Sequence, residues 1–439
     1  MRPSTPLARL TLLALPFAVA GCPSSEPEPT VFWTDVAPIV EAHCVECHSD
    51  GGVAPFRLDT YDAAAPWASA SASAVAGRDM PPFLVRDDGT CGEYEDGHWL
   101  TDADIATLGV WAAEGAHEGD GATVTVPTPN VLDGELTATE TPVFSPEIVG
   151  GDFAEFDEYR CFMAELPTSD GDAFLTGYEV LPGNEAIVHH VIGFPVVLNG
   201  ESDSFGRTNQ EVIDDLRAQE PDRDGWPCFS GAGANVSYDF EVVAWAPGQG
   251  PVEYPEGVGL QLPEDSVMIY QVHYNLVDPA THGSSDQTVV NLRIVDEVER
   301  QAYMTLPDGF LGGLSDSSIP PGQSDASISF ELPISWIVGN VPLTFEILAI
   351  LPHMHERGRE MHVRLEHDDG AETCVTEVQN WDFNWQRMYM YERPIQFDTT
   401  DTLHVECIYD TSNDDDPITP GWGTQNEMCL PGVLVTVAQ

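Results

Sequence analysis

The spacing of the apolar residues changes once along the chain, near residue 119. Within 105–111, Ile105, Leu108 and Trp111 recur at helical spacing after a capping sequence that begins at Thr101. Beyond residue 143 the spacing becomes two, as in 267–273. The 38 Gly and 35 Pro also disfavour an all-helical chain. We therefore predict a multidomain protein, with a small all-α domain followed by two all-β sandwich (jelly-roll-like) domains.

The expected domain boundaries follow the composition. Residues 22–30 are Pro-, Ser- and Glu-rich, and residues 120–143 are polar with many Thr and Pro, so both should be linking segments. Within 343–351 the odd-numbered residues are apolar and should share one face of a strand. The full division is a leader at 1–21, a tether at 22–30, an all-α domain at 31–119, a linker at 120–143, and β-sandwiches at 144–297 and 298–439.

The amino terminus has the features of an export signal. Arg2 and Arg9 supply positive charge before the apolar stretch 10–20, and this stretch is too short to span a membrane. The stretch ends in Val-Ala-Gly-Cys22, which resembles the cleavage box of bacterial lipoproteins. We expect an exported bacterial lipoprotein at the periplasmic face or cell surface, held to the membrane only through a lipid on Cys22. An ordinary signal peptide with a chance cysteine is the alternative.

The charge is strongly acidic, with 73 Asp and Glu against 16 Lys and Arg. Nucleic-acid phosphates are bound by clustered basic residues, so no nucleic-acid partner is expected. The acidic surface fits a heavily solvated protein, or one that docks to a basic electron donor.

Residues 44–48 read Cys-Val-Glu-Cys-His, the pattern of c-type haem attachment. Cys44 and Cys47 would bind one covalent haem c and His48 its iron, which makes the all-α domain cytochrome c-like and an electron carrier. Met80 precedes a Pro pair, as the second axial ligand often does in the small bacterial cytochromes that this segment resembles. A zinc site or a disulfide is the alternative for the cysteines. The histidines that compete with Met80 are His43, His98 and His117.

Four later segments carry candidate metal ligands: His189-His190, Gln271-Val-His273-Tyr, His353-Met-His355 and Glu427-Met428-Cys429. Adjacent histidines point to opposite faces of a regular strand, so they share a metal only at a strand end or a bulge. Histidines two residues apart lie on one face and can bind one ion. Taken singly, each segment is more often structural.

The ordered set resembles the copper type II monooxygenases, the family of peptidylglycine α-hydroxylating and dopamine β-monooxygenases, over about residues 144–439. The segments 157–162, 243–247 and 381–386 share in the resemblance. It implies two copper ions, O2 as co-substrate, a small organic substrate hydroxylated at a C–H bond, and a small reductant such as ascorbate. It implies that the first copper is bound by His189, His190 and His273, and the catalytic second copper by His353, His355 and Met428.

The fusion to a haem motif suggests how electrons arrive. Hydroxylation with O2 takes two electrons from an external donor, either a small reductant or a redox protein. We infer from the fusion alone that the haem delivers or helps to deliver them.

The same resemblance implies the disulfides Cys161–Cys228 and Cys407–Cys429, while Cys91 and Cys374 either pair across domains or stay free. Peptide-amidating members carry Arg two residues before the His-x-His pair, Asn after the Met-Cys pair and Tyr two residues further on. This chain has Leu351, Leu430 and Gly432 there, so a peptide with a C-terminal glycine is not the expected substrate.

Two other functions compete with the enzyme. One is a non-catalytic haem/copper electron-transfer or copper-binding surface lipoprotein on the same fold, and the other is a cytochrome joined to a sugar- or partner-binding sandwich. Retention of all six copper ligands favours the enzyme. The histidines outside the pattern, which should be surface or structural residues, are His282, His362, His367 and His404.

Overall fold

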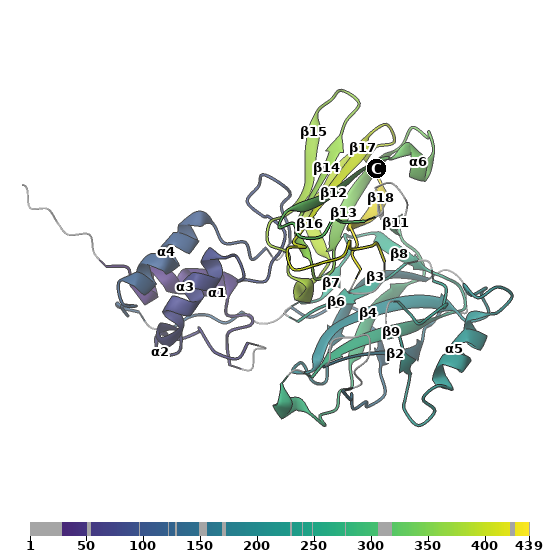
Figure 1. The fold of residues 1–439 in the computed structure, drawn as a ribbon, viewed down its shortest axis with the longest axis horizontal. Helices are drawn as coiled ribbons and strands as arrows, with labels where there is room; N and C mark the ends of the chain where they lie inside the picture. Colours follow the sequence, from purple (N-terminus) through teal and green to yellow (C-terminus); the bar gives the residue numbers. More distant parts are fainter. Residues whose placement is uncertain are drawn as a thin grey trace, which may run out of the picture.

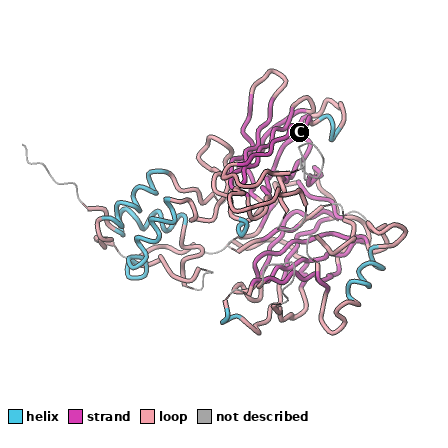
Figure 2. Tube along the Cα trace, viewed as in Figure 1, coloured by secondary structure: helices cyan, strands magenta, loops and turns pink. Residues whose placement is uncertain are grey.

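The structure is a computed structural model, and it describes residues 29–438 except 51–53, 96, 122, 128–129, 149–155, 169–172, 229–230, 239, 248, 277, 306–317 and 422–425. The expected leader 1–21 and Cys22 lie outside the described residues. A small helical unit lies beside a larger body of β-strands (Figures 1 and 2). None of the described helices is long and apolar enough to cross a membrane.

The helical unit has its own apolar core, in which Phe32, Val36, Leu108 and Trp111 are buried together. Its longest helix begins at the capping box that Thr101 and Asp104 form, as the sequence predicts. The helices are η1 (Phe32–Val36), α1 (Ala37–His43), α2 (Tyr61–Ala64), η2 (Ala65–Trp67), α3 (Ala68–Ala76) and α4 (Asp102–Ala113). They are short and are joined by irregular segments, so a cytochrome c-like all-α domain stays a prediction.

The segment 83–94 belongs structurally to the β-body, although the expected all-α domain 31–119 includes it. Phe83, Leu84, Val85 and Tyr94 are buried in the core of the C-terminal sandwich. The backbone of Val85 forms a bridge to Val378, and that of Tyr94 forms one to Tyr391. The expected boundary is wrong here because apolar residues of this loop are buried against strands more than 280 positions away in the sequence.

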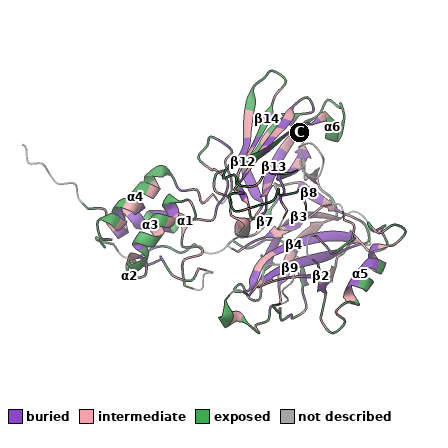
Figure 3. Cartoon of the chain, in the orientation of Figure 1, coloured by how far each residue is buried: buried purple, intermediate pink, exposed green. Residues whose placement is uncertain are grey.

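The N-terminal sandwich packs a five-stranded sheet against part of a larger one, with Phe162, Leu175, Tyr270 and Val290 buried between them. Strands β4 and β9 run through the purple, buried part of Figure 3. Within the described residues the five-stranded sheet has the order β5 (Trp226–Pro227), β2 (Asp157–Glu165), β9 (Ser266–Asn275), β4 (Val188–Val197) and β6 (Val243–Trp245). Helix α5 (Asn209–Arg217) and the short η3 (Pro279–Thr281) lie in its connections.

The larger sheet runs through both sandwiches without a break. Its described strands are, in order, β1 (Thr137–Glu140), β10 (Val289–Val295), β3 (Ala173–Leu181), β8 (Val258–Leu262), β11 (Arg300–Thr305), β18 (Leu430–Val437), β13 (Thr344–His353) and β16 (Tyr389–Asp398), with β7 (Val252–Glu253) beside β3. Strand β11 joins the halves, because it pairs in parallel with β8 and antiparallel with β18. Strand β1 falls in the expected linker 120–143: Thr139 is buried and its hydroxyl lies 2.6 Å from that of Tyr270, so part of this polar segment is an edge strand.

The C-terminal sandwich is closed by a four-stranded sheet. Among the described residues its order is β12 (Ala326–Pro333), β17 (Thr402–Tyr409), β14 (Gly358–Glu366) and β15 (Glu372–Val378). The connections include α6 (Ser335–Val338) and η4 (Phe383–Trp385).

A bulge in β13 overturns the expectation of one uninterrupted apolar face in 343–351. The ladders on both sides of β13 shift between Ile347 and Ala349. As a result Phe345 and Ile347 are buried in the C-terminal core, whereas Ala349 is buried with the N-terminal one. A bulge adds one residue to the strand, so side chains beyond it exchange faces.

Candidate functional site

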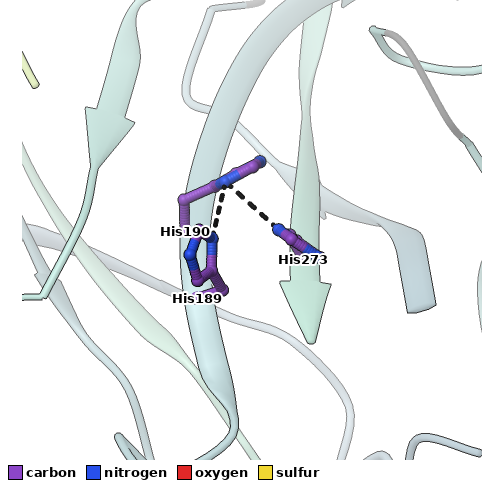
Figure 4. A group of neighbouring side chains, drawn as sticks. All are labelled: His189, His190 and His273. Carbon is purple, nitrogen blue, oxygen red and sulfur yellow. Dashed lines mark hydrogen bonds between the residues drawn. The ribbon is translucent and has the colours of Figure 1, made fainter. Parts of the chain in front are cut away.

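Three histidines from two paired strands meet in the N-terminal sandwich (Figure 4). His189 and His190 lie in β4 and His273 in the neighbouring β9. The β4–β9 ladder shifts between Val188 and His190, which is the bulge that adjacent histidines need in order to reach one ion. Nδ1 of His190 lies 3.4 Å from Nδ1 of His189 and 3.4 Å from Nδ1 of His273. One ring nitrogen from each lies within 4.8 Å of the other two, a spacing suited to one metal ion.

The surroundings of these rings favour neutral imidazole, the form that binds metals. Burial lowers the pKa of His190 well below its ordinary value, and the neighbouring His273 and His189 lower it further. Burial also lowers the pKa of His273. His353 is among the groups whose charge acts on His190, so the second pair of histidines described below lies within electrostatic reach.

Two residues of β2 orient His273, and no role was predicted for either. Nε2 of His273 lies 3.2 Å from Oδ1 of Asp157, while the ring stacks on Tyr159 with centroids 4.1 Å apart. Histidines that bind metals commonly hold a carboxylate with the second ring nitrogen. The alternation of Asp157 and Tyr159 places both on one face of a strand, but only the pairing of β2 with β9 shows which histidine they contact.

His353 and His355 lie together at the end of β13, with ring centroids 5.1 Å apart and planes nearly perpendicular. The Nδ1 atom of His353 donates to Oε1 of Gln386 at 2.5 Å, and the Nδ1 atom of His355 donates to the carbonyl of Asn426 at 3.1 Å. With Nδ1 donating in both rings, Nε2 is the nitrogen that would act as the metal ligand. Burial, followed by the effect of His355, lowers the pKa of His353 to about 3, so its ring is neutral at ordinary pH.

The segment that carries Met428 is fixed beside this pair. Oε2 of Glu427 accepts a hydrogen bond from the backbone N–H of His355 at 2.8 Å, and the Tyr409 hydroxyl donates to the carbonyl of Met428 at 2.8 Å. Met428 itself is 1% exposed. Two residues later, Leu430 is the ladder partner of His353. A buried methionine thus lies in a segment bonded to the end of β13, and a thioether with two imidazoles is a donor set that suits Cu(I).

The helical unit contains the remaining expected ligands around one cavity of about 560 Å³. Cys44, Cys47, His48 and Met80 all line it, and neither cysteine is in a disulfide. Nδ1 of His48 donates to the carbonyl of Phe56 at 2.9 Å, so its Nε2 is the nitrogen left for a metal. The competing His43 and His98 also line the cavity, whereas His117 is not among its lining residues.

Four histidines outside the predicted sites make other contacts. Nε2 of His282 lies 2.9 Å from the carbonyl of Leu276. The other three lie within ion-pair distance of acidic residues, as surface or structural histidines do: His362 with Glu360, His367 with Asp401, and His404 with Glu366.

The structure contains the two disulfides that the resemblance implies, Cys161–Cys228 and Cys407–Cys429. The second is formed by the residue that follows Met428. The remaining cysteines form a third disulfide, Cys91–Cys374, which joins the segment 83–94 to β15. Of the two possibilities that the sequence left open, pairing between the expected domains is therefore the correct one.

Two family profiles match the chain. The N-terminal domain of the copper type II ascorbate-dependent monooxygenases matches residues 153–280, and the C-terminal domain matches residues 311–433. Together they cover more than half of the chain. Both histidine clusters and Met428 lie inside the matched ranges, and the helical unit lies outside them.

Curated relatives match the same part of the chain. Tyramine beta-hydroxylase of Caenorhabditis briggsae is 24% identical over 291 residues, which are 62% of this chain and 44% of the relative. DBH-like monooxygenase protein 1 of Gallus gallus is 25% identical over a region that covers 63% of this chain and 44% of the relative's length. Dopamine beta-hydroxylase of Homo sapiens is 25% identical over 62% of this chain and 42% of its own. The chain thus spans less than half the length of these relatives.

Proposed function

The chain belongs to the copper type II ascorbate-dependent monooxygenase family, and we propose from this that it is a dicopper enzyme that hydroxylates a C–H bond of a small organic substrate with O2. One copper is bound by His189, His190 and His273, and the other by His353, His355 and Met428. The observation that carries this proposal is the meeting of three imidazoles, one buried and two half-buried, from a bulged strand and its neighbour, within 4.8 Å.

The residues present fit the two metals. In the first cluster every ligand is an imidazole, burial lowers the pKa of His190 and His273, and such a set tolerates both copper oxidation states. In the second, the thioether of Met428 favours Cu(I). Bound copper would supply one-electron chemistry and an O2-reactive centre. The overall reaction inserts one oxygen atom into the C–H bond and reduces the other to water, which consumes two electrons and two protons.

The protein's own groups position these ligands. Asp157 and Tyr159 hold the ring of His273, and Gln386 holds that of His353. Glu427 binds the backbone N–H groups of both His355 and Arg357, at 2.8 Å each, which ties the Met428 segment to the end of β13. These contacts hold the ligand side chains in position, so the site needs less reorganisation when a metal binds.

The helical unit is proposed to hold a covalent haem c that delivers electrons. Two thiols without a disulfide, His48 with Nε2 available and Met80 surround one largely apolar cavity, whose 560 Å³ volume lies in the range of cofactor pockets. A haem with His and Met ligands supplies one-electron transfer. Ascorbate or another small reductant, or a redox protein, would reduce it.

The substrate side differs from that of peptide-amidating members. Leu351 and Gly432 are direct ladder partners, so two of the departures from the amidating pattern occur at one place beside His353. An apolar side chain and a glycine offer no cation for a peptide carboxylate. We propose a small organic substrate without that carboxylate, in line with the small molecules that name the tyramine and dopamine relatives.

We also propose that the protein is exported. Three disulfides join described cysteines, and such bonds persist in oxidising compartments outside the cytosol. Lipid attachment at Cys22 would hold the protein at the periplasmic face or the cell surface.

The activity is tested by isotope incorporation. The copper- and haem-loaded protein, with ascorbate, is incubated with phenethylamine-type and other small substrates under isotopically labelled O2, and products are analysed by mass spectrometry. We expect one labelled oxygen atom per product molecule, and no product from the Met428→Ala/His353→Ala variant. Unlabelled product, or equal product from the variant, would contradict the proposal.

A further inference from the structure

We propose that Trp385 and Gln386 connect the haem cavity directly to the second copper centre, so that electrons enter the β-body at His353 rather than at the three-histidine cluster. This inference rests on the proposed function, which assigns haem to the cavity and copper to His353, His355 and Met428.

The cavity is built by both parts of the molecule. Most of its wall comes from the helical unit, including Cys44, Cys47 and His48, but, besides Phe83 of the segment 83–94, four residues come from the β-body. These four are Ala246 and Pro247, which follow β6, and Trp385 and Arg387, which lie at and just after η4. A group bound in the cavity would therefore touch the copper-binding part of the chain.

The joint between the two parts is fixed by several bonds. The disulfide Cys91–Cys374 ties the segment 83–94 to β15. The Leu84 N–H donates to the Tyr389 hydroxyl at 3.1 Å. Beside Met80, the side-chain amide of Asn380 donates to the Arg78 carbonyl at 3.3 Å and to Oδ1 of Asp79 at 3.2 Å. The cavity wall contributed by Trp385 is therefore held in one place.

Two consecutive residues, Trp385 and Gln386, lead from that wall to His353. Trp385 lines the cavity, and the next residue, Gln386, accepts the Nδ1 hydrogen of His353 at 2.5 Å. The amide nitrogen of Gln386 donates to the Phe383 carbonyl at 2.8 Å, which turns its oxygen toward the histidine. The aromatic ring of Trp385 at the cavity is thus connected, through the side chain of the next residue and one hydrogen bond, to the proposed copper ligand His353.

The neighbouring Arg387 fits the anionic part of a haem. Its Nε is buried and, among the described residues, has no hydrogen-bond partner. Its guanidinium carbon lies 5.8 Å from the ring centre of Phe83 and 5.3 Å from that of Tyr389. Haem carries two carboxylates, and a buried arginine with an unused donor is a suitable partner for one of them.

An alternative path leads to the three-histidine cluster. It begins at Pro247 or Ala246, which offer no aromatic ring, and continues to Trp245. From there it must cross the β6–β4 ladder to Val191 before it reaches His190. In the transfer we propose, ferrous haem becomes ferric and one Cu(II) becomes Cu(I), with no bond formed or broken. The external donor then returns one electron to the haem.

The inference is tested by flash reduction. In the oxidised, haem- and copper-loaded protein, a photoexcited flavin gives one electron to the haem, and loss of the ferrous absorbance reports transfer to copper. We expect reoxidation to persist in His189→Ala, which lacks the first copper, and to disappear in His355→Ala/Met428→Ala, which lacks the second but keeps the Gln386–His353 bond. Copper analysis of each variant verifies which ion is missing.

A matched pair of variants tests the path itself. Trp385→Leu should slow reoxidation by about tenfold, equivalent to about 1.4 kcal/mol in activation free energy. Trp336→Leu, the same change at a 69% exposed position in α6, should not. Reoxidation that disappears in His189→Ala, or an unchanged rate in copper-loaded Trp385→Leu, would overturn the inference but leave the proposed function standing. A protein that takes up no haem or no copper would overturn both.

Discussion

Nε2 of His273 lies 3.2 Å from Oδ1 of Asp157, so the ring nitrogen that faces His190 is Nδ1. The carboxylate belongs to β2 and the histidine to β9, two strands that pair over nine residues. This contact fixes the orientation of the imidazole before any metal binds.

Replacing this carboxylate should weaken the first copper site. We expect Asp157→Asn to lower copper affinity at the three-histidine cluster by roughly 10- to 100-fold, as loss of a carboxylate behind a ligating histidine commonly does. Competition titration with a copper chelator measures the copper affinity of each site. The second site should keep its affinity, and the exposed Asp416→Asn serves as the control. Wild-type affinity at both sites in Asp157→Asn would contradict the assignment.

Glu427 should stabilise the end of β13. Its two carboxylate oxygens accept the N–H groups of His355 and Arg357, whereas the amide of Glu427→Gln can accept only one of them. A buried donor left unpaired costs about 1–3 kcal/mol. Urea denaturation of the copper-free protein should show a loss of this size, and an unchanged midpoint would count against the described bonds.

The disulfide between Cys91 and Cys374 should stabilise the joint between the helical unit and the β-body. It closes a loop with a sequence separation of 283, and a native disulfide typically contributes about 2–4 kcal/mol. The Cys91→Ser/Cys374→Ser variant should therefore unfold at a lower temperature in calorimetry. It should also be cleaved sooner near residues 83–94 by a protease, and equal resistance would speak against a fixed joint.

Stability near Glu241 should depend on pH. Burial raises the pKa of this carboxyl, and its Oε2 has no hydrogen-bond partner among the described residues. A raised folded-state pKa favours the folded state at acidic pH, and that contribution is lost as the pH rises through the raised value. Glu241→Gln should match the wild type below about pH 4 and melt at a higher temperature at neutral pH. Equal melting temperatures at both pH values would refute this.

Much of the β-region and the clustering of His189, His190 and His273 could be predicted from the sequence. Two adjacent histidines required a bulge if they were to share an ion, and the β4 ladder shifts at that point. The two disulfides implied by the resemblance are both present. The capping box at Thr101 was readable because all its atoms lie within four residues.

What the sequence could not provide depends on pairing between distant segments. The bulge in β13 places Ile347 and Ala349 on opposite faces of the strand, and no Gly or Pro at that point indicates a bulge in the sequence. The burial of Phe83 and Tyr94 in the C-terminal core depends on strands near residues 378 and 391. The contact of Gln386 with His353 likewise becomes visible only when η4 lies beside β13.

The central claim is tested most directly by counting metals in the purified protein. Copper is measured by mass spectrometry and haem by its absorbance after denaturation, in the wild type and in Met428→Ala/His353→Ala. The account predicts two coppers and one haem per chain, falling to one copper and one haem in the variant. Haem without stoichiometric copper would contradict the monooxygenase and leave an electron carrier joined to a β-rich region.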